Sequence, residues 1–255
     1  MLLATWNVNS IRARDPRVRA FLLARRPDVL CLQELKCEEA QFPLEWFREQ
    51  GFHVAMAAQK TYNGVALVSR FPLEEVEAGL GDGDEDPQAR LIAATVRGVR
   101  LLSAYFPNGQ SLGSDKYQYK LRWMQRLRAH LAARYRPDQL LALCGDFNVA
   151  PEPLDVHDPA RWEASVLFSP EVREELRRVQ AFGLVDAFRL FHAEAAFSWW
   201  DYRAGNFRRD AGLRIDHVYV TQPLAARCRS AAIDRDERKG EGASDHAPVL
   251  VEIDV

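Results

Sequence analysis

The sequence lacks the features that define several common classes of protein. Its four cysteines form no Cys-x-x-Cys pair, which argues against both a zinc cluster and a disulfide framework. No apolar run approaches the roughly 20 residues that a membrane helix requires. The first residues contain neither the basic segment nor the cleavage site of a signal peptide. We therefore expect a protein of the cytoplasm that makes no use of a membrane.

The sequence also lacks an excess of positive charge. Its net charge of −2 gives no global signal for nucleic acid, so any polyanion would have to bind a local basic face. Arginine outnumbers lysine, which suits bidentate contacts with phosphate, although genomic composition explains such a bias equally well. With 255 residues, 47% of them hydrophobic, and no low-complexity linker, the chain is predicted to form a single domain over residues 1–255.

What the chain does contain is a series of short apolar runs with turn residues between them. Because the first two runs are separated by a segment long enough for a helix, they are expected to be parallel strands of a βαβ unit. Strands are predicted over residues 2–6, 29–32, 64–68, 91–96, 99–105, 139–144, 213–220 and 249–253, and helices from Asp15 and Pro16 onward and over residues 115–135 and 170–182. Many strands with few helices favour an α+β fold of two packed sheets covered by helices.

Near the middle of the chain, a polar pair follows one of these apolar runs. Asp146 and Asn148 stand two residues apart at the end of the predicted strand, so they share a face while Phe147 points into the core. A carboxylate beside an amide suits a hard metal ion, a water molecule or a phosphate oxygen. An ordinary Asp-Phe-Asn turn is an equally good interpretation of this segment when it is taken alone.

Other polar residues stand at the ends of predicted strands in the same way. Taken alone, Glu34 is more typical of a solvated loop, and His246 of a satisfied structural histidine. The whole set is Asn7, Glu34, Tyr105, Asp146, Asn148, Asp216, Asp245 and His246. Because these ligands are mostly oxygen with one imidazole, they favour Mg²⁺, with Mn²⁺ as a substitute, over zinc. Mg²⁺ with carboxylates is the usual arrangement for phosphate chemistry.

Six short motifs occur in an order that resembles a known family from one end of the chain to the other. They are residues 6–9 (Trp-Asn-Val-Asn), 32–34 (Leu-Gln-Glu), 105–109 (Tyr-Phe-Pro-Asn-Gly), 145–148 (Gly-Asp-Phe-Asn), 214–216 (Arg-Ile-Asp) and 244–246 (Ser-Asp-His). The sequence closely resembles the exonuclease III family of apurinic/apyrimidinic (AP) endonucleases, in the endonuclease/exonuclease/phosphatase superfamily. The resemblance implies a deoxyribonuclease-like, four-layer sandwich of two β-sheets flanked by helices. It also implies a divalent-metal site and cleavage of the DNA backbone 5′ to an abasic nucleotide, with 3′→5′ exonuclease and 3′-end-cleaning activity.

The resemblance, combined with general chemistry, suggests roles at the metal and at the attacking water. Glu34 is expected to be the principal metal ligand, with Asn7 and Asp245 close by. The metal would polarise the phosphate and stabilise the leaving 3′ oxygen. Asp146, oriented by Asn148, is expected to hold and deprotonate the water.

Further catalytic roles are expected on the phosphate. Asp216 would fix the imidazole of His246, raise its pKa and favour a cation that donates to a phosphate oxygen. Tyr105 would place its hydroxyl on the phosphate. His217, which should point away from the face of Asp216, is expected to be structural.

The resemblance assigns recognition of the substrate to an aromatic segment. Several scattered arginines and lysines are further candidates for contacts with the DNA. Trp199, Leu213 and Ile215 would line a small apolar pocket for a flipped-out sugar that lacks its base. Contacts with the DNA are expected from Asn108, Arg203, Arg12 and Lys36, together with Arg208 and Arg209, although each arginine or lysine is equally well explained as a solvated surface charge. The expected partner is double-stranded DNA with abasic sites or blocked 3′ ends, bound by a monomer in the cytoplasm, in association with the nucleoid.

Some features leave alternatives open. Leu35 stands where the family usually has threonine, and residues 111–120 differ among family members, so the balance of endonuclease, exonuclease and 3′-phosphatase activities is not predicted. The metal count and the choice of Asp146 or Tyr105 as proton acceptor are also open. The rival hypotheses are a related phosphoesterase that acts on RNA or small phosphoesters, and an inactive DNA-binding module.

Overall fold

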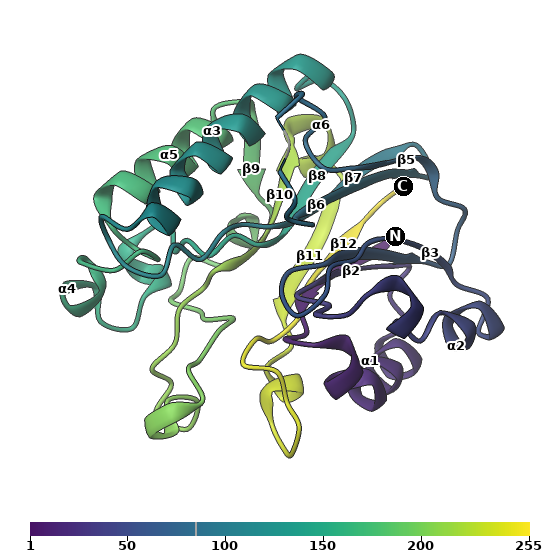
Figure 1. Cartoon of the computed structure of the whole chain (residues 1–255), viewed down its shortest axis with the longest axis horizontal. Helices are drawn as coiled ribbons and strands as arrows, with labels where there is room; N and C mark the ends of the chain where they lie inside the picture. The colour runs from purple at the N-terminus through teal and green to yellow at the C-terminus, as the bar shows by residue number, and fades with distance from the viewer. Residues whose placement is uncertain (85) are drawn as a thin grey trace.

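The computed structural model of residues 1–84 and 86–255 contains two six-stranded sheets that pack face to face (Figure 1). The first sheet has the order β11 (Cys228–Ile233), β12 (Val249–Ile253), β1 (Leu2–Asn7), β2 (Val29–Gln33), β4 (Val65–Ser69) and β3 (His53–Ala57). The second has the order β5 (Glu74–Ala78), β6 (Leu91–Val96), β7 (Val99–Tyr105), β8 (Leu141–Asp146), β10 (Asp216–Thr221) and β9 (Leu184–Asp186). The pairs β1–β2 and β7–β8 are parallel, as expected for the first pair from its intervening helix.

Helices cover the outer face of each sheet (Figure 1). The α-helices are α1 (Ile11–Arg25), α2 (Leu44–Glu49), α3 (Asp115–Arg134), α4 (Pro159–Trp162), α5 (Pro170–Gln180) and α6 (Gln222–Ala225). The 3₁₀ turns are η1 (Glu39–Gln41), η2 (Pro153–Asp155), η3 (Phe188–Leu190), η4 (Arg203–Gly205) and η5 (Arg235–Arg238). Helices α1 and α2 lie on the first sheet, and α3 and α5 on the second.

Three apolar layers hold these four layers of secondary structure together. The layer between the sheets includes Cys31 of β2 and Cys144 of β8, which are both completely buried. A second layer joins α3 and α5 to the second sheet through residues such as Leu127, and a third joins α1 and α2 to the first sheet through residues such as Phe21. Burial of apolar surface in all three layers drives the fold. The predicted four-layer α+β sandwich is therefore confirmed.

Helix α1 begins five residues earlier than the sequence predicts. Ser10, not Asp15, is the N-cap, and its hydroxyl accepts from the amide of Ala13. Pro16 lies inside the helix instead of in its first turn. The earlier start is fixed by the neighbouring loop, because the amide of Ile11 donates to the carbonyl of Leu35 at 3.1 Å, a contact that local sequence does not reveal.

Strand β10 begins later than predicted, at Asp216 instead of Leu213. Leu213 forms isolated bridges with Val156 and Trp199 before the chain enters the sheet. Its neighbour Arg214 donates its amide to the carbonyl of Asp155, so these residues bind the adjacent loops and not strand β8.

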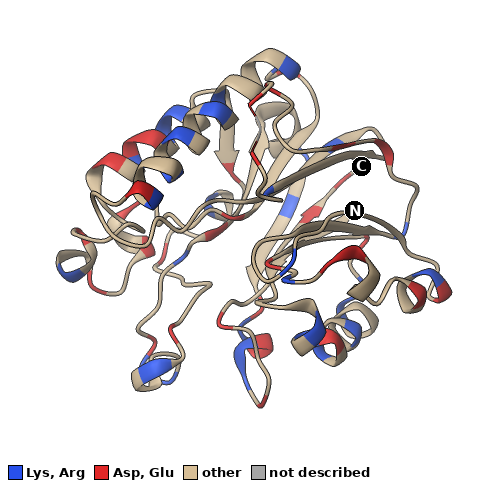
Figure 2. Cartoon of the chain, viewed as in Figure 1, with Lys and Arg blue, Asp and Glu red and all other residues tan. Residues whose placement is uncertain are grey.

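The charged side chains are mixed over the surface. Figure 2 shows Lys and Arg interspersed with Asp and Glu along the outer helices α3 and α5. No helix among residues 1–84 and 86–255 has both the length and the apolar composition needed to span a membrane.

Candidate active site

Sheet register brings three of the predicted catalytic residues into one row. Tyr105 is the last residue of β7 and Asp146 the last of β8, and the two are partners in the parallel pair. Asp216 is the first residue of the antiparallel strand β10 and pairs with Asp146 on its other side. Residues that are far apart in sequence therefore meet at one edge of the second sheet.

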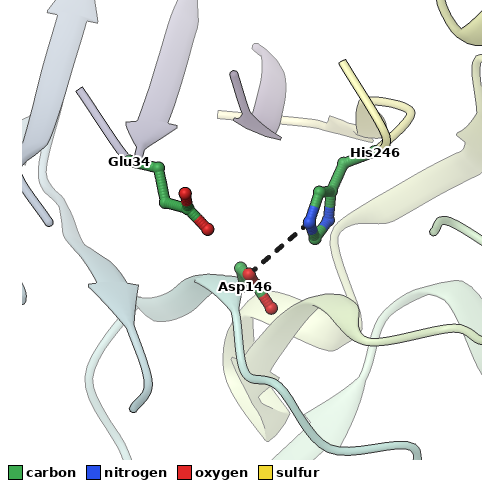
Figure 3. Close-up of side chains that lie close together, drawn as sticks. All are labelled: Glu34, Asp146 and His246. Carbon is green, nitrogen blue, oxygen red and sulfur yellow. Dashed lines mark ion pairs between the residues drawn. The ribbon is translucent and has the colours of Figure 1, made fainter. Parts of the chain in front are cut away.

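The first sheet contributes Asn7 and Glu34 to the same place. Asn7 is the last residue of β1, and Glu34 follows β2 directly. The side-chain amide of Asn7 donates to Glu34 Oε1 at 2.9 Å and to Asp146 Oδ2 at 2.8 Å, so it links the two sheets. Figure 3 shows Glu34, Asp146 and His246 facing one another across the gap between the strand ends.

His246 and Asp216 form the predicted pair. The imidazole Nδ1 lies 2.9 Å from Asp216 Oδ2, and the Nε2 atom faces Asp146 Oδ2 at 3.8 Å. Ser198 holds the carboxylate in place, because its hydroxyl donates to Asp216 Oδ2 at 2.6 Å. Because Nδ1 is bound to Asp216, Nε2 is the ring nitrogen that is left to meet a ligand. His246 is only 4% exposed.

Burial and like charges shift the pKa values of these groups. Burial, with smaller contributions from Asp216 and Glu34, raises the pKa of Asp146 to about 7 against the opposing charge of His246. Burial alone would lower the pKa of His246, but Asp216 and Asp146 outweigh it and raise the pKa to about 10. His246 is therefore a cation at neutral pH, and Asp146 titrates close to neutrality.

Tyr105 and the asparagines complete the site around Asp146. The hydroxyl of Tyr105 donates to Glu34 Oε1 at 2.8 Å, and burial together with Glu34 raises its pKa well above the ordinary value. The amide of Asn148 donates to Asp146 Oδ2 at 3.3 Å and its oxygen accepts from Asn108 at 3.0 Å. Asp146 is thus held by an amide from each side.

The donor set fits a divalent cation. Ligand atoms of Glu34, Asp146 and His246 lie within 4.8 Å of one another, and the carboxylates are the hard oxygen donors that Mg²⁺ or Mn²⁺ prefers. Lys36 also neutralises Glu34, with Nζ 2.6 Å from Oε2. The Asp245 oxygens instead accept from Asn9 at 2.9 Å and from Trp199 Nε1 at 3.0 Å. Asp245 would have to exchange these partners to join Glu34 and Asn7 as a ligand.

The predicted pocket residues lie together, next to the catalytic cluster. Leu213 and Ile215 are 0% and 1% exposed in the core below the second sheet, and half-buried Trp199 packs against the same cluster. Trp199 also pairs through its backbone with His246. Its neighbour Trp200 is fully buried and belongs to the core.

The predicted DNA-contacting cations are placed less closely. Lys36 contacts the site through Glu34, whereas Arg203 is bound to Asp201 in an exposed loop. Arg12, Arg208 and Arg209 are exposed. Of all the residues predicted to contact DNA, the structure brings only Lys36 and Asn108 into the catalytic cluster.

Sequence reasoning missed three residues that shape the site. Asn9 links Lys36 to Asp245, and Ser198 fixes Asp216. Arg90 lies 4.9 Å above the Tyr105 ring and donates to its carbonyl at 3.1 Å. The Asn-Val-Asn repeat around residue 7 was a usable signal for Asn9, but nothing in the local sequence pointed to the other two.

The two-sheet fold and the cluster of carboxylates with a histidine define the class of deoxyribonuclease-like phosphoesterases that depend on a divalent metal. A sequence model described as "Endonuclease/Exonuclease/phosphatase family" matches residues 4–246. Exodeoxyribonuclease III of Haemophilus influenzae is 34% identical over 265 residues, which cover 99% of each chain. The solved structure of an AP endonuclease from Archaeoglobus fulgidus has a TM-score of 0.97 at 39% identity, and that of a 3′ phosphatase from Neisseria bound to a product DNA hairpin has 0.96 at 41%, each over 100% of both chains.

The chain therefore belongs to the endonuclease/exonuclease/phosphatase family. The predicted exonuclease III-type resemblance and the predicted class of enzyme, a nuclease, are both confirmed.

Proposed function

We propose that this chain is a Mg²⁺-dependent DNA repair phosphodiesterase that cleaves the backbone 5′ to abasic sites and also cleans blocked 3′ ends. The observation that carries the proposal is the convergence of Glu34, Asp146 and His246 within 4.8 Å at the edge where both sheets end. It is supported by the similarity to an AP endonuclease and to a 3′ phosphatase bound to DNA. We also propose that the chain acts as a monomer, which a single site of this kind permits.

The residues divide the work of phosphodiester hydrolysis between them. Glu34, with Asn7 and Asp146 within reach, would hold the metal, which when bound supplies positive charge beside the phosphate and the leaving 3′ oxygen. The His246 cation has Nδ1 committed to Asp216, so Nε2 is free to donate to a phosphate oxygen. Such donors typically lower the barrier to reaction by about 3 kcal/mol.

Asp146 is the better candidate for the group that accepts the proton of the water. A pKa of about 7 suits a general base at neutral pH. Tyr105 donates its hydroxyl to Glu34, and its pKa lies well above the ordinary value, so it stays protonated at neutral pH and no phenolate is available to accept a proton. We assign proton abstraction to Asp146 and a hydrogen bond with the phosphate to Tyr105.

Selection of the lesion would depend on the apolar residues beside the catalytic cluster. Trp199 pairs through its backbone with Leu213 and with His246, and its side chain packs against the core that contains Leu213. A sugar without a base leaves the helix easily because its stacking is already lost. It would meet half-buried Trp199, because Leu213 and Ile215 are 0% and 1% exposed. An intact nucleotide would be excluded because its base is too large to fit.

The test is incubation of the purified protein with duplex oligonucleotides that contain one abasic-site analogue, in Mg²⁺ or in EDTA. We expect incision 5′ to the analogue in Mg²⁺ only, and a loss of about 10³-fold or more in Asp146→Asn, which keeps the shape but removes the base. Asp138→Asn, at an exposed position, is the matched control and should cut normally.

The same assay separates the rival hypotheses. Equal cutting of undamaged duplex would overturn the proposed selection of the lesion. Turnover of RNA or inositol phosphates in preference to the abasic duplex would indicate another branch of the family. Binding of DNA without any incision in Mg²⁺ or Mn²⁺ would indicate an inactive binding module.

A further inference from the structure

A left-handed turn carries Asn148, and two buried side chains bind it from opposite sides. The backbone of Asn148 has a φ of 49°, in the left-handed region, which asparagine adopts more readily than most L-residues. Its own amide N–H donates to Asp146 Oδ1 at 2.8 Å, so the turn sets the position of Asn148 relative to the proposed base. The carbonyls of Asn148 and Val149 need hydrogen-bond partners of their own.

Lys120 supplies the partner on one side. This residue of α3 is 0% exposed, and its ammonium donates to the carbonyls of Asn148 at 2.7 Å, Val166 at 2.6 Å and Asn108 at 3.2 Å. All three of its N–H groups are used, as a buried ammonium requires. The side chains of Asn108 and Asn148 are bonded to each other at 3.0 Å, so one lysine holds the backbone of both.

His217 supplies the partner on the other side. Its Nε2 lies 2.9 Å from the carbonyl of Val149, and its Nδ1 lies 3.1 Å from Arg214 Nη1. A guanidinium only donates, so Nδ1 must accept and the proton must be on Nε2, which then donates to Val149. Burial and the Arg214 charge lower the pKa of His217 to about 4, which agrees with a neutral ring.

Arg214 in turn is fixed by two carboxylates. Its guanidinium, 1% exposed, contacts Asp155 and Asp186 at 2.7 Å each. A chain of buried polar groups therefore runs from these acids through Arg214 and His217 to the carbonyl of Val149. A neutral histidine relayed in this way has one allowed orientation, so it fixes the turn more tightly than an apolar side chain of similar size.

We propose that Lys120 and His217 are positioning residues for the nuclease reaction, which clamp the backbone of residues 148 and 149 so that Asn148 and Asn108 meet Asp146 in the productive geometry. Neither side chain reaches the substrate in this proposal. This proposal rests on the proposed function, which supplies the reaction. It adds that removal of either side chain slows turnover and leaves substrate binding nearly unchanged.

The first experiment compares Lys120→Met with Leu127→Ala on the abasic duplex in Mg²⁺. Leu127 lies on the same helix, seven residues after Lys120, and is fully buried in the apolar layer against the second sheet. Its truncation therefore costs stability without removing a hydrogen bond to the turn. We expect Lys120→Met to lower kcat by about 10- to 100-fold with KM nearly unchanged, as for a small misplacement of catalytic groups. Leu127→Ala should lower the melting temperature but keep kcat. Equal kcat in the two variants, measured where circular dichroism shows both to be folded, overturns the role of Lys120.

The second experiment uses a conservative rescue at residue 217. Glutamine offers an oxygen to Arg214 and an N–H to Val149, whereas leucine offers neither. We expect His217→Leu to lower kcat about 10-fold and His217→Gln to restore most of it. The same kcat for the glutamine and leucine variants overturns the role of His217.

A third measurement does not depend on DNA cleavage. The imidazole ¹H–¹⁵N spectrum of the wild type at pH 6 should show His217 neutral with its proton on Nε2; a proton on Nδ1, or a charged ring, overturns the relay. If the wild type does not cut the abasic duplex, the proposed function fails, and the kinetic comparisons are made on bis(4-nitrophenyl) phosphate with Mn²⁺. The same outcomes at Lys120 and His217 then support or overturn the clamp.

Discussion

His217 is surrounded by the rings of Phe147 and Tyr219 and by the guanidinium of Arg214, so a second proton on its ring, at Nδ1, has no acceptor. Its pKa falls from 6.5 to about 4 on folding. The unfolded chain therefore takes up this proton at a higher pH than the folded protein does. The contribution of the neutral ring to stability is fully present above pH 6.5, and it is lost as the pH falls towards 4.

We predict that His217→Gln flattens this dependence. The free energy of unfolding of the wild type should lose up to about 3 kcal/mol more than that of the variant between pH 7 and pH 4. Asp146, whose pKa is raised on folding, changes stability in the opposite direction over this range, but it does so in both proteins. Urea titrations followed by circular dichroism provide the measurement, and parallel curves for the two proteins would contradict the prediction.

Among single residues, the sequence predicted those that belong to short motifs of polar side chains. Glu34, Asp146 and His246 each stand beside a strand end, and strand ends of one edge must converge. His217 was expected to be structural, but its contacts and those of Lys120 were not predicted, because their partners include main-chain carbonyls from distant segments, which no side-chain pattern encodes. The orientation of Asp245 escaped for a similar reason, since it depends on Asn9 and Trp199.

Among the elements, the parallel pair β7–β8 depends on one glycine. Gly145 has a φ of 143°, and a Cβ at this position would lie 1.9 Å from the carbonyl oxygen of Ala104, its partner in the pair. Backbone cannot move away without opening the strands that carry Tyr105 and Asp146. Only glycine allows this close approach.

We predict that Gly145→Ala costs about 4 kcal/mol or more of stability, or abolishes folding. Gly98→Ala is the control: Gly98 also has a positive φ, of 78°, in the turn between β6 and β7, but a Cβ there meets nothing within 4 Å. That change should cost only about 1–2 kcal/mol, the penalty of the left-handed conformation. Urea unfolding measures both, and similar costs at the two glycines would show that the contact with Ala104 can relax.

The elements themselves were predicted according to their burial. The fully buried strands β2 and β4 and the apolar side of α3 have clear patterns, and their bounds agree within a few residues. The edge strands β5 and β11 were not predicted, because most of their residues are exposed or half-buried, and β5 also contains three glutamates. Strand β3, half-buried at the other edge, was missed for the same reason.

Across the whole molecule, the active site is a junction between the two sheets. Glu34 follows a strand of the first sheet and Asp146 ends a strand of the second, while His246 lies in the loop that leads to β12 beside β1. Below them, buried Gln33 donates to Thr5 Oγ1 at 3.0 Å and, across the interface, to Ser103 Oγ at 3.1 Å. The order of motifs along the chain predicted this convergence, but the polar contact between the sheets was visible only in three dimensions.

A divalent cation that binds this junction should stabilise the whole fold, because its ligands come from both sheets and are far apart in the unfolded chain. Glu34 and Asp146 place two carboxylates near each other, and a bound cation would relieve their repulsion. By mass action, Mg²⁺ at about 100 times its dissociation constant adds roughly 2.7 kcal/mol. For a domain of this size we expect a rise of several degrees in Tm.

Differential scanning calorimetry of the protein in EDTA and in increasing Mg²⁺ measures this rise, without reference to activity. Glu34→Gln should abolish the rise, because it removes a charged ligand that faces Asp146, whereas Glu49→Gln, at an exposed position of α2, should preserve it. Without metal, Glu34→Gln loses the contacts of Glu34 with Lys36 and Asn7, which lowers stability. It also removes the repulsion between Glu34 and Asp146, which offsets part of that loss. An equal rise in melting temperature in both variants would show that the cation binds elsewhere on the surface and not between the two sheets.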